Sequence, residues 1–305
     1  DGLNSFKRIA TLPESDGNAG VQLYLTNTDR VLARPQWNYG GLYEISSNSS
    51  LISLMPDSLS GKINALTVSD SIVFILMEYK GLIKTSLNFE KFEILSPPSF
   101  GENLEWYAFS GTIIHNPIKN QLIFKHDNYG YYTFDLNAKS WQSLSALNDL
   151  PQSSNYNYGK MINDSTSVYV INKGVGVYKA HFDLMSWSKI SESPSSSYFK
   201  WLEYKNNTLF LMDASGSEGV LYISSDSAKT WSSHNIEDLK NDTFSFLSYP
   251  NSVYPLTENK YVFCSYANGA VIADFNNNTW EQIPGISATG FNEQRGWILN
   301  NGSNI

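Results

Sequence analysis

Tryptophan residues recur at a nearly fixed interval from residue 141 onward, and this interval constrains the fold more than any other feature. Trp141, Trp187, Trp231 and Trp280 follow one another at spacings of 46, 44 and 49 residues. Each lies in a similar stretch, in which a strand-like segment is followed by a polar turn and then by the tryptophan. Self-similarity at a fixed period of this length is the signature of repeat architectures. The chain is therefore predicted to consist of repeated units of roughly 45 residues.

Each unit shows the same order of segments. An alternating strand comes first, such as 252–259, and a more apolar strand follows it. A turn containing glycine leads to a third strand, and a polar turn with Asp or Asn leads to a fourth strand that opens with Trp or Phe. Four short strands per unit without helical periodicity predict an all-β fold, a β-propeller of four-stranded antiparallel blades. A two-sheet sandwich is the alternative, but nothing in a sandwich requires this period. The predicted second strands are 71–77, 121–126, 167–172, 208–213 and 260–266.

The two ends of the chain bear on the number of blades. Six units run from about 13 to 284. The segment 5–12 has the pattern of a fourth strand, and 289–305 has the pattern of the first strands of a unit. A composite blade built from both termini would close the ring and remove free sheet edges. We therefore expect a single domain, 1–305, with seven blades, and six blades is the alternative.

Composition and charge favour an exported protein that does not bind nucleic acid. Charged residues make up only 16% of the chain, and Ser, Asn, Thr, Gly and Tyr are abundant. The net charge of −8 argues against a nucleic-acid partner, because phosphate binding needs clustered Lys and Arg. No window approaches the roughly 18 apolar residues of a membrane span. The start at Asp1 without Met suggests a removed leader or a trimmed chain, with room for a lipid anchor upstream. We expect a monomer at the cell surface, in the periplasm or outside the cell.

The stretch YISSDSAKTW, residues 222–231, lies in the predicted turn between a third and a fourth strand. It resembles the Asp-box (BNR) repeat of sialidases, sortilin-type receptors and photosystem-assembly propellers, whose pattern is Ser-x-Asp-x-Gly-x-Thr-Trp. Ser224, Asp226, Thr230 and Trp231 match this pattern, and Ala228 stands where it has Gly. The resemblance implies a noncatalytic exported bacterial member of the sialidase- and sortilin-like propellers, in which the box has a structural role.

Physical chemistry gives each residue of this stretch a local role. Asp226 is expected to accept hydrogen bonds from turn amides, and Trp231 to pack between neighbouring sheets. Glycine is usual where the backbone needs a positive φ, so Ala228 implies modest strain or a different turn. Neither catalysis nor calcium binding is expected of Asp226.

Sialidase activity is not expected. In the sialidases that the stretch resembles, catalysis needs three arginines that clamp a carboxylate, a Tyr–Glu nucleophile pair and an Asp acid/base. The segment 6–10, FKRIA, only partly matches the arginine motif of that family, and no Arg occurs from 35 to 294. The chain has only Arg8, Arg30, Arg34 and Arg295.

Other catalytic chemistry finds little support in the sequence. A glycoside hydrolase with a carboxylate pair in a central cleft is the alternative function. The acidic residues near the ends of second strands are interpreted as solvated turn residues: Glu78, Asp127, Asp213 and Glu218. The histidines are scattered without metal-ligand spacing, so no metal and no cofactor is expected: His115, His126, His181 and His234. Cys264 is interpreted as a buried free thiol.

Aromatic residues gather in the loops that share one end of the predicted propeller. These loops join second to third strands and fourth to first strands, and Asn, Ser and Asp flank the aromatic residues. Flat apolar contact beside amide hydrogen bonds suits a sugar ring or a protein partner, and both classes of ligand stay open. The candidate ligand-binding residues are Trp37, Tyr39, Trp106, Tyr129, Tyr156, Tyr158 and Trp201.

Overall fold

The computed structural model describes the backbone of most of the repeat region. The described residues are 21–26, 28, 30–35, 41–46, 50–96, 99–100, 104–105, 112–126, 130–144, 147, 159–172, 174–183, 186–195, 199–205, 207–213, 220–235, 250–257, 259–265, 269–277 and 279–282.

Six four-stranded antiparallel sheets, here called blades 1 to 6, account for nearly all of the described strands. In each blade the strands pair in chain order. Blade 1 comprises β1 (Val21–Leu25), β2 (Val31–Pro35), β3 (Tyr43–Ile45) and β4 (Leu51–Ser53); blade 2 comprises β5 (Ile63–Ser69), β6 (Ile72–Met77), β7 (Gly81–Ser86) and β8 (Phe92–Ser96); blade 3 comprises β11 (Ile113–Asn116), β12 (Gln121–His126), β13 (Gly130–Asp135) and β14 (Ser140–Ser143).

Two short elements lie between the blades of the first half of the chain. A 3-10 turn, η1 (Asp57–Leu59), precedes blade 2, and a hairpin of β9 (Ser99–Phe100) and β10 (Leu104–Glu105) precedes blade 3.

The second half of the chain repeats the plan of the first half. Blade 4 comprises β15 (Gly159–Asn163), β16 (Ser167–Asn172), β17 (Gly176–His181) and β18 (Ser188–Ser191); blade 5 comprises β19 (Phe199–Lys205), β20 (Thr208–Asp213), β21 (Val220–Ser224) and β22 (Ser232–Asn235); blade 6 comprises β23 (Pro250–Pro255), β24 (Lys260–Ser265), β25 (Gly269–Asp274) and β26 (Thr279–Gln282).

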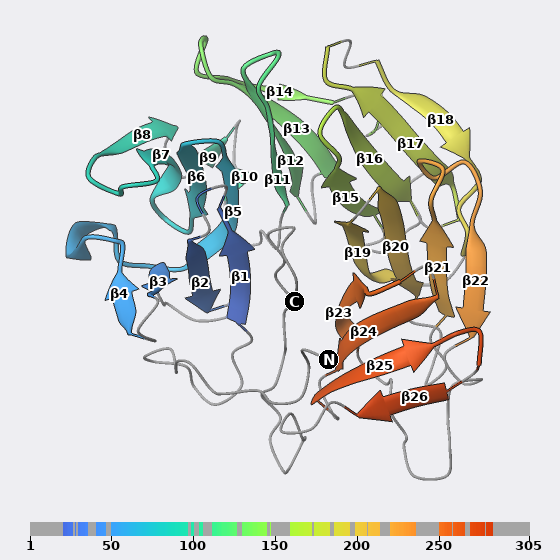
Figure 1. Cartoon of the computed structure of the whole chain (residues 1–305). Helices are drawn as coiled ribbons and strands as arrows, with labels where there is room; N and C mark the ends of the chain where they lie inside the picture. The colour runs from blue at the N-terminus through green and yellow to red at the C-terminus, as the bar shows by residue number, and fades with distance from the viewer. Residues whose placement is uncertain are drawn as a thin grey trace.

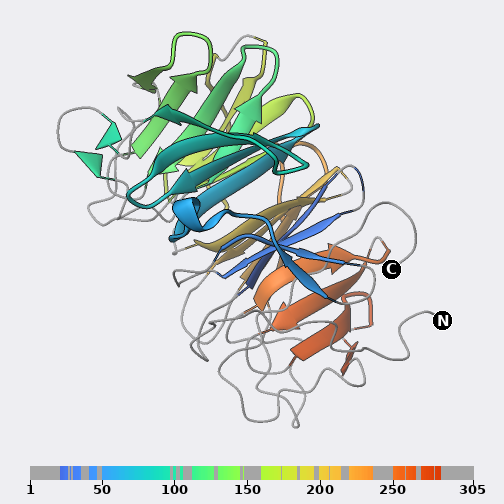
Figure 2. The same cartoon turned by 90° about the vertical axis from the view of Figure 1, so that its left-hand side faces the viewer.

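The blades follow one another around an arc, with the first strand of each on the inner side and the fourth on the outer side (Figure 1). Seen from the side, successive sheets lie face against face (Figure 2). The arrangement gives the molecule two ends. We call the end where second strands lead to third strands, and fourth to first, the loop face. The opposite end, where first strands lead to second and third to fourth, is the turn face.

The second strands are apolar throughout because both of their faces are buried. Side chains alternate along a strand, so neighbouring residues point to opposite faces of the sheet. In β16, Val168 and Val170 pack toward blade 3, whereas Tyr169 and Ile171 pack toward blade 5. Five apolar clusters of this kind join successive blades among the described residues. At roughly 25 cal/mol per Å² of buried apolar surface, these inter-blade seams supply the main stabilising contribution.

The all-β, four-stranded propeller predicted from the repeat is confirmed, and most second strands lie where they were predicted. β12, β16 and β20 begin and end at the predicted residues, and β6 and β24 differ by one residue at one end. The first strand predicted at 252–259 overlaps β23 but has the wrong bounds, because β23 runs from Pro250 to Pro255 and the amides of Leu256 and Thr257 donate to the Lys260 carbonyl beyond it.

The prediction of seven blades is not confirmed. The described residues form six four-stranded sheets, not seven. Residues 5–12 and 289–305, which were expected to build a composite blade, lie outside the described residues. Closure of the ring by the two termini therefore stays a prediction, as does the single domain spanning 1–305.

Candidate functional site

The loop face carries the longest connections of the described fold. The connection from β14 to β15 spans 144–158, and that from β22 to β23 spans 236–249. On the turn face, only residues 70–71 separate β5 from β6, and only 206–207 separate β19 from β20. Binding residues concentrate on variable loops held by a rigid scaffold. The loop face is therefore the candidate functional site.

Asp213 is a buried structural carboxylate on the loop face. It ends β20, and only 2% of the residue is exposed. The Ser195 hydroxyl donates to its Oδ2 at 2.8 Å, and the Val220 amide donates to its Oδ1 at 3.0 Å. Ser195 lies in the connection between blades 4 and 5, so Asp213 fixes that loop against its own hairpin. The expectation of a solvated turn residue is wrong here, because hydrogen-bond donors compensate the burial of the charge.

Glu78 is the second buried carboxylate of the loop face. It follows β6 directly, and the residue is 7% exposed. Its backbone amide donates to the Lys62 carbonyl at 2.9 Å, and its Oε2 lies 3.8 Å from the Lys62 ammonium nitrogen. The expectation of a solvated turn residue is wrong for Glu78 too. The sequence signal for both burials was their position at the end of an apolar second strand, where Asp213 is the last residue of β20 and Glu78 directly follows β6.

Sequence reasoning missed Tyr79, which follows Glu78 on the same face. This side chain is one of the exposed large hydrophobic residues, at 64%. Its backbone is left-handed, with φ 61°. The three-residue loop between Met77 and Gly81 is what demands this conformation, and Gly81 itself has φ 89°. A Tyr inside a short hairpin with a glycine at its end was the available signal.

The aromatic residues predicted to bind a ligand are not placed by the structure. Trp37, Tyr39, Trp106, Tyr129, Tyr156 and Tyr158 lie outside the described residues, as do Asp127 and Glu218. The backbone of Trp201 lies in β19, but its side chain is also outside the described part. Their role in ligand binding therefore stays a prediction.

On the turn face, the residues singled out in the stretch 222–231 form a closed hydrogen-bond network. Asp226 Oδ1 accepts hydrogen bonds from the Ser224 hydroxyl at 2.8 Å and from the Thr230 amide at 3.0 Å. Its Oδ2 accepts the Thr230 hydroxyl at 2.7 Å. These donors, the Thr230 hydroxyl foremost, lower the pKa of Asp226 to about 2. Asp226 therefore accepts hydrogen bonds within its own turn, while its assignment to an Asp box stays a prediction.

Ala228 occupies a left-handed position at the centre of that turn. Its φ is 67°, and its neighbour Ser227 has φ 61°. The Ala228 amide donates to the Ser224 hydroxyl at 2.9 Å, and its carbonyl accepts the hydroxyl of Ser191 from blade 4 at 2.7 Å. Its methyl group is fully buried in the cluster between blades 4 and 5. The sequence predicted either modest backbone strain at Ala228 or a different turn. The positive φ of Ala228 shows the strain.

The recurring tryptophans fill the seams between blades. Trp141 packs in the cluster of blades 2 and 3, Trp187 in that of blades 3 and 4, and Trp231 in that of blades 4 and 5. Each of these three tryptophans therefore lies between its own blade and the preceding one, and Trp231 was expected to pack between neighbouring sheets. The indole N–H of Trp141 donates to the Ser96 hydroxyl at 2.9 Å, whereas the buried indole nitrogens of Trp187 and Trp231 have no hydrogen-bond partner among the described residues.

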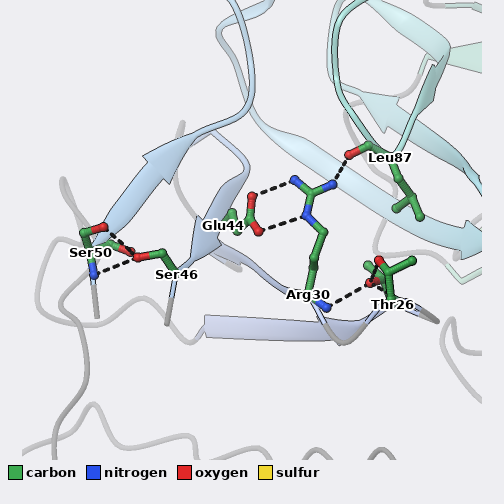
Figure 3. Close-up of polar contacts among 7 residues, drawn as sticks. Thr26, Arg30, Glu44, Ser46, Ser50 and Leu87 are labelled. Carbon is green, nitrogen blue, oxygen red and sulfur yellow. Dashed lines mark hydrogen bonds and ion pairs between the residues drawn. The ribbon is translucent and has the colours of Figure 1, made fainter. Parts of the chain in front are cut away.

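The described arginines are engaged inside the protein. Figure 3 shows Arg30 on the turn face, where it makes paired hydrogen bonds to Glu44 at 2.9 and 2.6 Å and a third to the Leu87 carbonyl of blade 2. The Arg30 hydrogen bond also holds the pKa of Glu44 below its usual value. Arg34 is buried and donates to the carbonyls of Ile63 and Asn64 in blade 2. Both side chains thus join blade 1 to blade 2.

Two histidines lie in the seams between blades. The ring of His115 packs against Phe74 of blade 2 at 5.0 Å, and its Nδ1 lies 2.6 Å from the Ser69 hydroxyl. The ring of His234 stacks on Phe275 of blade 6 at 4.2 Å. Burial lowers the pKa of both imidazoles. Within the described residues, no group of three or more His, Cys, Asp or Glu side chains could hold a metal ion.

Comparison with known proteins supports the fold alone. No model of a protein family matches the chain, and neither does any curated protein. Among solved structures, the extracellular domain of BT4673 from B. thetaiotaomicron superimposes with a TM-score of 0.59 at 14% identity over 92% of this chain and 36% of that chain. YCF48 from Cyanidioschyzon merolae superimposes with a TM-score of 0.57 at 11% identity over 92% of this chain and 89% of that chain.

A third similar structure is YCF48 bound to D1 peptide, with a TM-score of 0.54 at 13% identity over 90% of this chain and 89% of that chain. At identities this low, the similarity establishes the β-propeller and no activity. The chain spans only about a third of the length of the BT4673 domain, 36%. Across the described residues, no helix is long and apolar enough to cross a membrane.

Proposed function

We propose that the chain is a noncatalytic, exported β-propeller that binds a glycan or a protein through its loop face. The observation that carries this proposal is the asymmetry between the two ends. On the loop face, β14 ends at Ser143 and β15 begins only at Gly159, whereas the described turns of the turn face are short, such as 70–71, or internally hydrogen-bonded, such as 225–230. A scaffold with short, fixed turns at one end and long connections at the other can present those connections to a ligand.

The carboxylates described on the loop face support binding rather than hydrolysis. Glycoside hydrolysis needs two carboxyl groups that face each other across a substrate. Asp213 in blade 5 accepts hydrogen bonds from Ser195, Val220 and Tyr222, and Glu78 in blade 2 is paired with Lys62. Each is engaged within its own part of the scaffold.

Two further points of the proposal draw on the similar structures. The similar BT4673 structure is an extracellular domain, and this favours an exported location for the present propeller as well. YCF48 bound to D1 peptide shows that a propeller of this shape binds a peptide, which keeps a protein ligand open. The turn 222–231 has the hydrogen bonds expected of an Asp box, so we assign the chain to that group of propellers.

The test is a combined binding and hydrolysis assay on the full chain. A glycan array and a peptide array are screened with the wild type and with a variant in which Trp37, Tyr39, Tyr156 and Tyr158 are changed to Ala. We expect binding that the variant loses, and no release of reducing sugar by the wild type. Sugar release abolished by Asp213→Asn or Glu78→Gln would instead establish the glycoside hydrolase alternative.

A further inference from the structure

β8 is the edge strand of blade 2, and it carries a large apolar side chain in solvent. Within its sheet it pairs only with β7, so its other edge is not paired with any described strand. Ile94, in the middle of β8, is 56% exposed. The fourth strands β14, β18 and β22 have no exposed large hydrophobic residue among those described. An edge strand with an exposed apolar side chain is a template for pairing with another chain.

The apolar side chains lie at the outer end of the seam between blades 1 and 2. Ile94 is opposite Ile83 across the ladder, and Ile83 packs in the cluster of these two blades, so Ile94 points toward blade 1. Phe92, two residues earlier, packs against the same cluster. Ile52 of β4 is 47% exposed and points toward blade 2, because Leu54, two residues on, also packs there. Ile52 and Ile94 therefore flank an open, apolar rim.

The exposed part of the β8 edge is short and has clear limits. Residues 90, 91, 93 and 94 are exposed and Phe92 is half-buried. Leu95 and Ser96 are buried on one side of this stretch, and Phe89 is buried on the other. A second strand can therefore reach 90–94, and Phe92 lies at the centre of this segment.

Charge selects the same centre for a pairing between two copies of the chain. An antiparallel alignment about Phe92 places Lys91 opposite Glu93 of the second copy, and Glu93 opposite its Lys91. Opposite charges across a ladder are stabilising, and like charges are destabilising. An alignment centred on Lys91 or on Glu93 would place two like charges directly opposite each other. In the favoured alignment the two Phe92 rings meet, and each Ile94 lies diagonal to the ring of the other copy.

We propose that the chain forms a two-fold symmetric dimer in which the β8 edges of two copies pair antiparallel about Phe92. A contact of this kind uses the same surface on both copies and closes at two. Because the two-fold axis reverses the strand direction, the two loop faces point to opposite ends of the dimer, which can bind two ligands at once. This inference goes beyond the proposed function and differs from the monomer expected from the sequence. The paired segment is short, so we expect a dissociation constant of roughly 1–100 μM.

The first experiment is sedimentation analysis of the full chain at concentrations from about 1 to 300 μM. Ile94→Asp places a charge beside the Phe92 ring of the second copy, and we expect the dissociation constant of the dimer to rise about tenfold or more. Ile118→Asp is the matched control. Ile118 is also an exposed isoleucine, at 62%, but it lies in the β11–β12 turn on the turn face. We expect this variant to dimerise as the wild type does.

The second experiment tests the charge pairing. Lys91→Glu places two carboxylates opposite each other and Glu93→Lys places two ammonium groups opposite each other, so each variant alone is expected to dimerise about tenfold less tightly or worse. An equimolar mixture restores both opposite-charge pairs, and we expect a heterodimer nearly as tight as the wild-type dimer. Glu93→Lys also removes the ion pair with Lys139, which is exposed and contributes little. A variant that had merely lost its fold would not recover in the mixture.

Each outcome bears on the dimer alone. A wild type that keeps the monomer mass at the highest concentration overturns the proposal. A dimer that tolerates Ile94→Asp and both charge variants forms through another surface and overturns it too, as does a failure of the mixed variants to recombine. Recovery in the mixture, with unchanged behaviour of Ile118→Asp, supports it. Ligand binding by the loop face is measured separately on the glycan and peptide arrays, so the proposed function stands or falls independently.

Discussion

At the scale of single residues, Ala228 shows how a turn motif survives a substitution that its backbone disfavours. A left-handed residue with a Cβ costs roughly 1–2 kcal/mol relative to glycine. The buried methyl offsets about 0.8 kcal/mol of this cost, and Ala also restricts the unfolded chain more than Gly does. The protein is therefore expected to be about equally stable with Ala or Gly at position 228.

Two substitutions at Ala228 test that reasoning. Ala228→Gly is expected to change the free energy of unfolding by less than about 1 kcal/mol. Ala228→Val is expected to cost about 2–4 kcal/mol, because a β-branched residue is strained at positive φ and the site has no space. Urea denaturation measures both values. A Gly variant less stable than the Val variant would mean that the methyl contact, not the backbone, dominates.

The tryptophan indole groups give a matched comparison. Trp141→Phe removes a hydrogen bond to Ser96, whereas Trp231→Phe removes a buried N–H that has no partner among the described residues. The loss of apolar area is similar, so Trp141→Phe is expected to be more destabilising by about 1–2 kcal/mol. Chemical denaturation of the two variants side by side measures the difference. Equal losses would show that the indole of Trp231 is satisfied in solution, for example by water.

At the scale of elements, the packing between blades explains which strands and which buried residues could be predicted from the sequence. The second strands were predictable because burial on both faces makes them continuously apolar, as in β16. The bounds of β23 were mispredicted because Pro250 opens it and the sequence after Pro255 continues the apparent alternation. The burial of Asp213 was not predictable, since one of its compensating donors, Ser195, comes from the connection to another blade.

The histidines in two seams predict a pH dependence of stability. The pKa of His115 and that of His234 are lowered by burial, so the folded state favours the neutral imidazole. The nearby Asp70 opposes this shift at His115, and Lys84 reinforces it. Because the unfolded chain then binds more protons, stability is full above the unfolded pKa of 6.5 and falls as the pH drops below it.

Urea denaturation at a series of pH values from 7 to 5 tests this prediction. The double variant His115→Gln/His234→Gln is expected to show a shallower fall in unfolding free energy than the wild type over this range. Asp226, with its pKa of about 2, titrates below this window and does not interfere. An identical slope in wild type and double variant would contradict the role of the two seams.

At the scale of the whole molecule, the repeat predicted the fold class but not its boundaries. The period of the tryptophans reports the blade-to-blade distance along the chain, because the indoles of Trp141, Trp187 and Trp231 each lie in one seam. The number of blades depends instead on the chain ends, whose pairing no local pattern specifies. The burial of Glu78 and the exposure of Tyr79 were hardest to predict, since both depend on a three-residue hairpin and, for Glu78, on a lysine from the preceding loop.

A single domain predicts a single unfolding transition. Apolar clusters join each described blade to the next, so local opening of one blade exposes its neighbour. Tryptophan fluorescence and far-UV circular dichroism are expected to report the same midpoint in urea. Separate midpoints would show that the blades unfold in groups.

The central claim is that the loop face binds the ligand, and hydrogen–deuterium exchange of the full chain tests it most directly. With the best ligand from the glycan and peptide arrays, the account predicts slower exchange in the hairpin from Met77 to Gly81 and in the loop-face connections. It predicts unchanged exchange in the turn-face segments 117–120 and 225–230. Protection confined to the turn face, with none on the loop face, would contradict the account.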